Sequence, residues 1–308
     1  MYLTKFPPIF RCLIALLASL QIISATAEET EADETLTPEQ LQYFEHISSL
    51  WQGMEKRTGV IELPGGIAKL DVPEEFYYLS PENTATVLEE FWGNPPGGET
   101  YGMIFPQAYT PFDGDSWGVT IQYVEEGYVS DDDADKIDYD DLLVDMKKDT
   151  REESAYRVEQ GYEAIELVGW AAPPHYNHTD KTLHWAQELA FGTDPGNDHV
   201  LNYNVRVLGR KGYLMLNYIA SIGQLEEINQ NLEPVMAMTE FNDGFKYDQF
   251  DPDMDEVAAY GIGALVAGKV LAKTGILMTL LLVLKKFWII LIVAIGAFFK
   301  KLFSRKSA

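Results

Sequence analysis

The charge pattern of the chain changes abruptly after Glu256, and this boundary limits what the chain can fold into. All 48 Asp and Glu residues lie between Glu28 and Glu256, where they face only 13 Lys and Arg. The residues that follow contain no acid and consist mostly of two apolar runs separated by Lys285 and Lys286. A helix in a soluble core does not normally continue so far without polar residues. The sequence therefore predicts an acidic globular part followed by a membrane anchor.

The first 27 residues have the pattern of a secretory signal peptide. Lys5 and Arg11 precede an apolar run, and Ala25-Thr26-Ala27 supplies small residues before a cleavage point after Ala27. An uncleaved N-terminal anchor is the alternative, although the apolar run is short for a membrane span. The only cysteine, Cys12, lies in this segment. The mature protein would then have no disulfide, no Cys nucleophile and no thiolate metal site.

Between the two ends, residues 28–50 read as an acidic flexible lead-in and residues 51–256 as an extracytoplasmic domain. Helices are predicted from Ser80, over 139–160 and near 224–239. Apolar alternation predicts strands around Pro64-Gly65-Gly66, over 163–171, 182–191, 199–209 and 212–221, with the strand at 200–208 half-buried. We expect an α+β fold, with antiparallel sheets and helices packed on one face, plus a C-terminal transmembrane helix.

Residues 257–284 are predicted to form the transmembrane helix, and 285–308 a second apolar segment with a basic tail. Small residues recur every four positions, so Gly263 and Gly268 are candidates for helix–helix packing and self-association in the membrane. Lys269 and Lys273 are candidate intramembrane charges, or they reach back to the lipid headgroups. The basic tail favours the cytoplasm and therefore one span. A two-span hairpin with the tail outside is the alternative.

Several blocks of sequence resemble a known family. They include "FWGNPPGGETYGMIFP", "GYVSDDDADKIDYDDLLVDMK", "GWAAPPHYN", "NYNVRVLGRKGYLMLN" and "FNDGFKYDQFDPDMDEVAAYGIGALVAGKVLAK". Together they resemble a family of uncharacterised bacterial membrane-anchored proteins, a domain-of-unknown-function family, over about residues 51–303. The resemblance implies a signal peptide, an extracytoplasmic domain and a C-terminal anchor in the bacterial inner membrane, with the domain facing the periplasm. It implies no activity. At the level of fold alone, the last strands and the closing helix resemble the Mog1/PsbP type of α/β sandwich.

Two clusters were weighed as metal sites. His175, His178 and His184 fall within ten positions, but their spacing is not a standard zinc pattern, and we expect His175 and His178 in a loop before the strand that carries His184. The run "SDDDADKIDYDD" offers oxygen ligands for weak calcium binding, yet Lys136 and Leu142 stand where an EF-hand needs Gly and Glu. We therefore assign no metal ligands and no cofactor.

The sequence offers no catalytic constellation, since it has neither a Gly-x-Ser-x-Gly elbow nor a phosphate-binding loop. The acidic charge argues against nucleic acid as a partner. We expect a non-catalytic, membrane-anchored envelope protein whose acidic domain binds an unknown envelope partner. The alternative is an envelope hydrolase or metal-dependent enzyme that uses the His175–His184 region.

Overall fold

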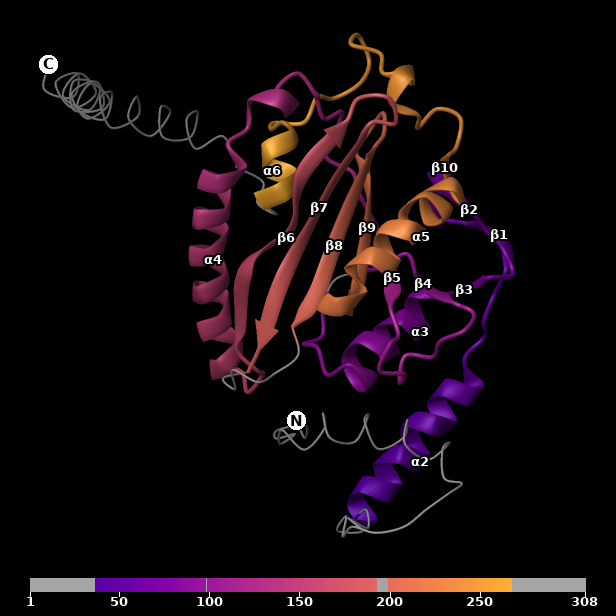
Figure 1. Cartoon of the computed structure of the whole chain (residues 1–308). Coiled ribbons are helices and arrows are strands. Elements are labelled where there is room, and N and C mark those ends of the chain that lie inside the picture. Colours follow the sequence, from indigo (N-terminus) through magenta and orange to yellow (C-terminus); the bar gives the residue numbers. More distant parts are fainter. Residues whose placement is uncertain (1–36, 98, 193–198, 268–308) are drawn as a thin grey trace, which may run out of the picture.

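The computed structural model describes residues 37–97, 99–192 and 199–267. Its centre is a seven-stranded antiparallel sheet in the order β3-β4-β5-β9-β8-β7-β6. A second antiparallel sheet has the order β1-β2-β10 (Figure 1). The strands are β1 Gly59–Glu62, β2 Ala68–Val72, β3 Phe76–Leu79, β4 Met103–Pro106, β5 Gly118–Val124, β6 Ile165–Asn177, β7 Thr182–Phe191, β8 Val200–Leu208, β9 Tyr213–Ser221 and β10 Thr239–Phe241. The predicted α+β class with antiparallel sheets is confirmed.

The described α-helices are α2 Pro38–Gly53, α3 Pro81–Thr86, α4 Tyr139–Glu159, α5 Leu225–Ala237 and α6 Ile262–Ala267, and a π-helical turn, Val87–Phe91, continues α3. Three of them, α2, α3 and α4, begin at a residue whose side chain caps them. Ser80 accepts a hydrogen bond from the Asn83 N–H at the start of α3, and Asp138 accepts from two N–H groups at the start of α4. The helices predicted from Ser80, over 139–160 and near 224–239 are confirmed within about two residues at each end.

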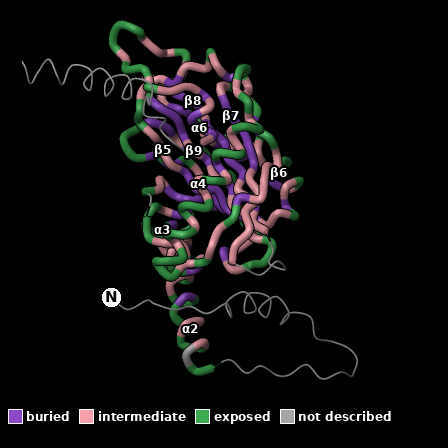
Figure 2. Tube along the Cα trace, turned by 90° about the vertical axis from the view of Figure 1, so that its left-hand side faces the viewer, coloured by how far each residue is buried: buried purple, intermediate pink, exposed green. Residues whose placement is uncertain are grey.

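The prediction that helices pack on one face of the sheet is wrong. On one face, α5 and the small sheet cover a core that includes Tyr203, Tyr218 and Ile228. On the other face, α4 and α6 pack over Leu183 and Trp185, while α2 and α3 pack over β3 and β4. The reason lies in the strands themselves, because residues of both parities are apolar along β7 and β9. Figure 2 shows buried residues gathered along the central strands and exposed residues mainly in the outer turns.

Strand β8 is likewise covered on both faces, although its alternation predicts a half-buried strand. Leu201, Tyr203 and Val205 face the α5 side, as expected. On the other side, Asn204 and Arg206 are each only 6% exposed. The Arg206 guanidinium lies 4.6 Å from the centre of the Trp185 ring and donates to the Asn204 side-chain oxygen at 3.2 Å. Partners on the sheet therefore compensate the burial of these polar groups.

The expected flexible lead-in at 28–50 is also corrected over its second half. Thr37 and Gln40 form a capping box, and Pro38 occupies the first turn, so the chain enters α2. Ile47 of α2 is buried with Tyr77 and other residues of β3 and β4. Tyr43, Phe44, Leu50 and Trp51 pack around the same cluster, so tertiary contact along one side of α2 stabilises the helix.

The described chain ends in α6, which is the beginning of the predicted anchor. Ile262, Leu265 and Val266 are at most 3% exposed and pack in the core with Met146 of α4. None of the helices within residues 37–267 is both long and apolar enough to cross a membrane. Gly268, Lys269, Lys273 and the predicted signal peptide lie outside the described residues.

Candidate functional site

The three histidines do not converge. His175 belongs to β6 and faces His184 of β7, and their rings stack with centres 5.0 Å apart. The expected loop position of His175 is therefore wrong, because β6 continues through Pro173 and Pro174 with register shifts. Prolines are tolerated there because β6 is an edge strand and because both lie within the register shift between Ala172 and His175, where the ladder with β7 is interrupted. His178 lies in the turn beyond β6, next to Asp135 at 3.3 Å.

His184 has the environment of a buried core residue. Its Nε2 lies 2.8 Å from the Thr182 hydroxyl, and its Nδ1 has no hydrogen-bond partner. Burial, with a smaller contribution from His175, lowers the pKa of His184 to about 4. Trp185 points to the opposite face, as strand alternation predicts. Within the described ranges, no group of three or more His, Cys, Asp or Glu side chains is placed to hold a metal ion.

The acidic run at 130–141 is folded against the domain by its own carboxylates. Asp131 accepts hydrogen bonds from Lys181 Nζ at 2.8 Å, the Tyr176 hydroxyl at 2.9 Å and the Tyr247 hydroxyl at 3.1 Å. Burial alone would raise the pKa of Asp131, but the bonds from Lys181 and Tyr176 outweigh it and hold the pKa below its usual value. A cation and two hydroxyls occupy this carboxylate, so Asp131 has a structural role.

Asp133 and Asp138 also hold the acidic run in place through hydrogen bonds. Asp133 accepts from the Ile262 N–H at 3.1 Å and so ties the run to the start of α6. Asp138 caps α4 through the N–H groups of Asp140 and Asp141. Three acids of the run considered for calcium thus have protein partners. The partners of Asp131 and Asp133 lie far away in the chain, so the local sequence pattern does not show them.

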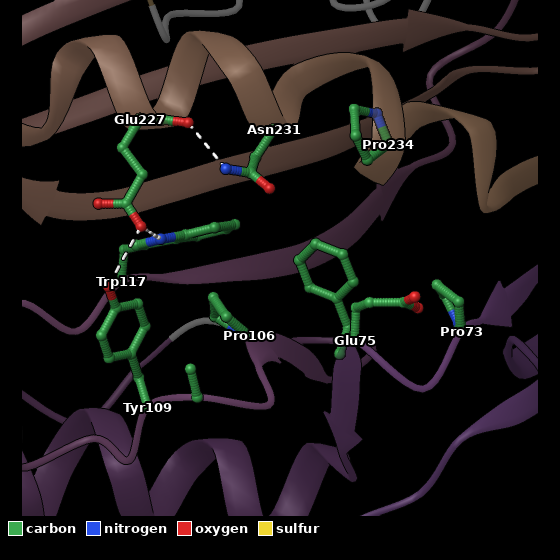
Figure 3. A pocket seen from close by; sticks show the side chains of 10 residues that line it. Pro73, Glu75, Pro106, Tyr109, Trp117, Glu227, Asn231 and Pro234 are labelled. Carbon is green, nitrogen blue, oxygen red and sulfur yellow. Dashed lines mark hydrogen bonds between the residues drawn. The ribbon is translucent and has the colours of Figure 1, made fainter.

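A pocket with a volume of about 500 Å³ lies between α5 and the strands β3 to β5. Figure 3 shows side chains from α5 on one side and from the β2–β3 turn, β4 and the loop after it on the other. We call it the α5 pocket. Its lining residues are Pro73, Glu75, Phe76, Pro106, Ala108, Tyr109, Trp117, Glu227, Asn231 and Pro234.

Glu227 organises the α5 pocket. Its carboxylate accepts from the Trp117 indole N–H at 2.8 Å, the Tyr109 hydroxyl at 3.4 Å and the Gln224 amide at 3.2 Å. All three donors are uncharged, so the negative charge of Glu227 is held in place but not neutralised by them. Burial, followed by Glu227, raises the pKa of Tyr109, which therefore stays protonated and keeps donating.

Family and structure comparisons add to this geometry. A family model described as "Protein of unknown function (DUF2167)" matches residues 55–296, which is most of the chain. The chain belongs to this family. The resemblance to a domain-of-unknown-function family is thereby confirmed, and DUF2167 membership assigns no activity to any residue. A search of curated proteins finds no match.

Among solved structures, one similar chain is the solution structure of cyanobacterial PsbP (CyanoP) from Synechocystis sp. PCC 6803. The similarity has a TM-score of 0.33 at 11% sequence identity, and it covers 61% of this chain and 92% of that chain.

The α5 pocket was missed by the sequence reasoning. Its residues come from four separate segments of the chain, and none of them forms a recognisable motif. One partial signal was available, because Glu227, Asn231 and Pro234 follow helical spacing and lie on one face of a predicted helix. Which strands that face would meet depends on the sheet order, and the sequence does not contain that order in any local pattern.

Proposed function

We propose that this protein is a non-catalytic, membrane-anchored envelope protein whose acidic extracytoplasmic domain binds a basic partner. The observation that carries the proposal is the α5 pocket, where Glu75 and Glu227 have no cationic partner among the described residues. The acidic surplus between Glu28 and Glu256 adds a long-range attraction for positive charge.

Attachment to the membrane rests on the sequence at the two ends. A signal peptide at 1–27 would export the domain, and the basic tail after Phe299 would stay in the cytoplasm. Because Ile262, Leu265 and Val266 are buried in the domain, we place the start of the span after Ala267 rather than at Val257. The run from Gly268 to Leu284 reaches the lower limit of length for a spanning helix.

Zero-length carboxylate–amine crosslinking of the full chain in its native membranes tests the proposal. We expect crosslinks that join Asp or Glu residues of 37–267 to Lys residues of a second protein, identified by mass spectrometry of the joined peptides. The yield should fall steeply between about 0.05 and 0.5 M salt, because an interaction between exposed charges is screened over a shorter distance at high salt. Crosslinks confined to this chain, or a yield insensitive to salt, would contradict a basic partner.

A further inference from the structure

The α5 pocket offers hydrogen-bond acceptors without matching donors. The Trp117 indole, the Tyr109 hydroxyl and the Asn231 amide nitrogen all donate to Glu227, the first two to its carboxylate and the third to its backbone oxygen. The prolines of the lining, Pro73, Pro106 and Pro234, have no N–H to contribute. Apart from the second N–H of the Asn231 amide, the polar side-chain groups left for a ligand are oxygens.

Carboxylates stand on both sides of the pocket. Figure 3 shows Glu227 on the α5 side and Glu75 on the strand side. Glu75 is exposed, and its side chain has no hydrogen bond or ion pair within the described residues. Negative charge at both edges excludes anions and favours a cation.

The floor between the two carboxylates is apolar and aromatic. Trp117 and Phe76 are 1% and 6% exposed, and their rings meet edge to face at 6.1 Å. Such an apolar floor suits the alkyl stem of a long side chain. A hydrated metal ion would gain nothing from it, because Mg²⁺ and Ca²⁺ are bound by oxygen ligands alone.

We propose that the α5 pocket binds an arginine side chain of an extended segment of the basic partner. A guanidinium group has five donors and no acceptor, which complements a pocket whose free polar side-chain atoms are mostly oxygens. Its planar face suits aromatic and proline surfaces better than the compact ammonium of lysine does. The pocket is open on one side and larger than one side chain, so a segment of chain fits it better than an enclosed small molecule. This inference rests on the proposed function, since it names the group of the partner that is recognised.

The test uses the detergent-solubilised full chain and a fluorescein-labelled peptide with three arginines separated by serines. Fluorescence anisotropy gives its Kd at low salt. The same peptide with citrulline in place of arginine keeps the shape but not the charge, and we expect it to bind at least tenfold more weakly. Replacement of arginine by lysine should weaken binding by a smaller factor, about three- to fivefold.

Two pocket variants locate the site. Glu227→Gln keeps an oxygen acceptor for Trp117 but removes the charge, and we expect a Kd about tenfold higher. Glu75→Gln disturbs no described hydrogen bond of the side chain. A higher Kd for this variant therefore cannot be explained by a folding defect, even if Glu227→Gln has one. Glu159→Gln, an exposed acid on α4 on the other face of the sheet, is the matched control for the loss of one negative charge. Its Kd should change less than twofold.

Each other outcome overturns the inference. If Glu159→Gln and Glu227→Gln weakened peptide binding equally, the net negative charge of the domain would attract the peptide and the α5 pocket would not bind it. Binding of N-acetyl-arginine amide as tight as that of the peptide would make this a small-molecule site. If the citrulline peptide bound as tightly as the arginine peptide, the positive charge would have no part in recognition. Crosslinks to a basic partner that survive Glu227→Gln and Glu75→Gln together would leave the proposed function standing while placing its interface elsewhere.

Discussion

Asp131 and Glu227 show that the role of a carboxylate is set by its neighbours. Asp131 has a lysine at 2.8 Å and two tyrosine hydroxyls, so its charge is compensated within the protein. Glu227 has three neutral donors and no cation in the described part of the chain. The first arrangement stabilises the fold, and the second orients a charge that a ligand can use.

Replacement of Asp131 by Asn should lower the free energy of unfolding by about 2 kcal/mol at pH 7, because Lys181 and both tyrosines lose a charged acceptor. The folded-state pKa of Asp131 lies below 3.8, so its contribution is complete above that pH and is lost as the pH falls through the lower folded value. The difference between wild type and variant should therefore shrink in acid.

Denaturant unfolding of the solubilised protein, followed by tryptophan fluorescence, measures this effect. Asp253→Asn is the control, because Asp253 is exposed and its substitution removes the same charge. An equal effect of the two substitutions would assign the loss to net charge rather than to the contacts of Asp131.

His184 gives the fold a second dependence on pH. Its folded-state pKa is about 4, against 6.5 for an ordinary histidine. As the pH drops from about 6.5 towards 4, the His184 imidazole is protonated in the unfolded chain but stays neutral in the folded protein. The free energy of unfolding therefore falls over this range. Between pH 7 and pH 5 the loss from this residue should be about 2 kcal/mol.

Proton NMR titration of the imidazole provides a direct check, since the His184 resonance should not shift between pH 7 and pH 5. His175→Gln removes the smaller of the two causes of the lowered value, so it should raise the pKa of His184 modestly. A His184 resonance that titrates near 6.5 would contradict its burial in the core.

At the scale of elements, α6 connects the domain to the apolar C-terminal part. Its N-terminus is tied to Asp133, and Leu265 is 3% exposed in the core beneath α4. Gly263 faces Ile137, where an added Cβ would lie 3.4 Å from the nearest side-chain carbon. In this structure Gly263 thus packs against the acidic run of the same chain.

Leu265→Ala should cost about 3 kcal/mol of unfolding free energy, because a large buried side chain is removed from a packed core. Val144→Ala, on an α4 position that is 67% exposed, should change it by less than about 0.5 kcal/mol. Chemical denaturation of both variants measures these changes in the free energy of unfolding. A neutral Leu265→Ala would mean that α6 leaves the domain, as expected if it formed part of the span.

At the scale of the whole molecule, the domain is a sheet covered on both faces, with its charge excess outside. The two chain ends that carry the proposed export and anchoring lie beyond the described residues. The acidic surface and the basic tail would then occupy opposite sides of the membrane.

The absence of cysteine after Cys12 makes this topology measurable. In intact cells, a membrane-impermeant maleimide should label Ala155→Cys, which is exposed on α4, and should not label Ser307→Cys until the inner membrane is permeabilised. The wild-type chain should remain unlabelled throughout, and its mass should correspond to a first residue of Glu28. Labelling of Ser307→Cys in intact cells would favour the two-span hairpin.

Local sequence signals were sufficient to predict most of the helices and the long strands. Ser80 and the apolar spacing after Tyr139 were enough to place α3 and α4, and alternation located the long strands. These signals are local, since caps and periodicity depend on residues within a few positions of one another. The acidic surplus and its end at Glu256 were also readable directly.

The tertiary structure alone decided which faces are covered and which groups meet. Ile47 stabilises α2 only because β3 and β4 lie beneath it. The buried Arg206 is stabilised only because its guanidinium contacts the Trp185 ring and the Asn204 side-chain oxygen. The α5 pocket joins Trp117 to Glu227 across more than a hundred positions. Contacts of that kind follow from sheet order and packing, and their energy depends on side chains that no local pattern relates to one another.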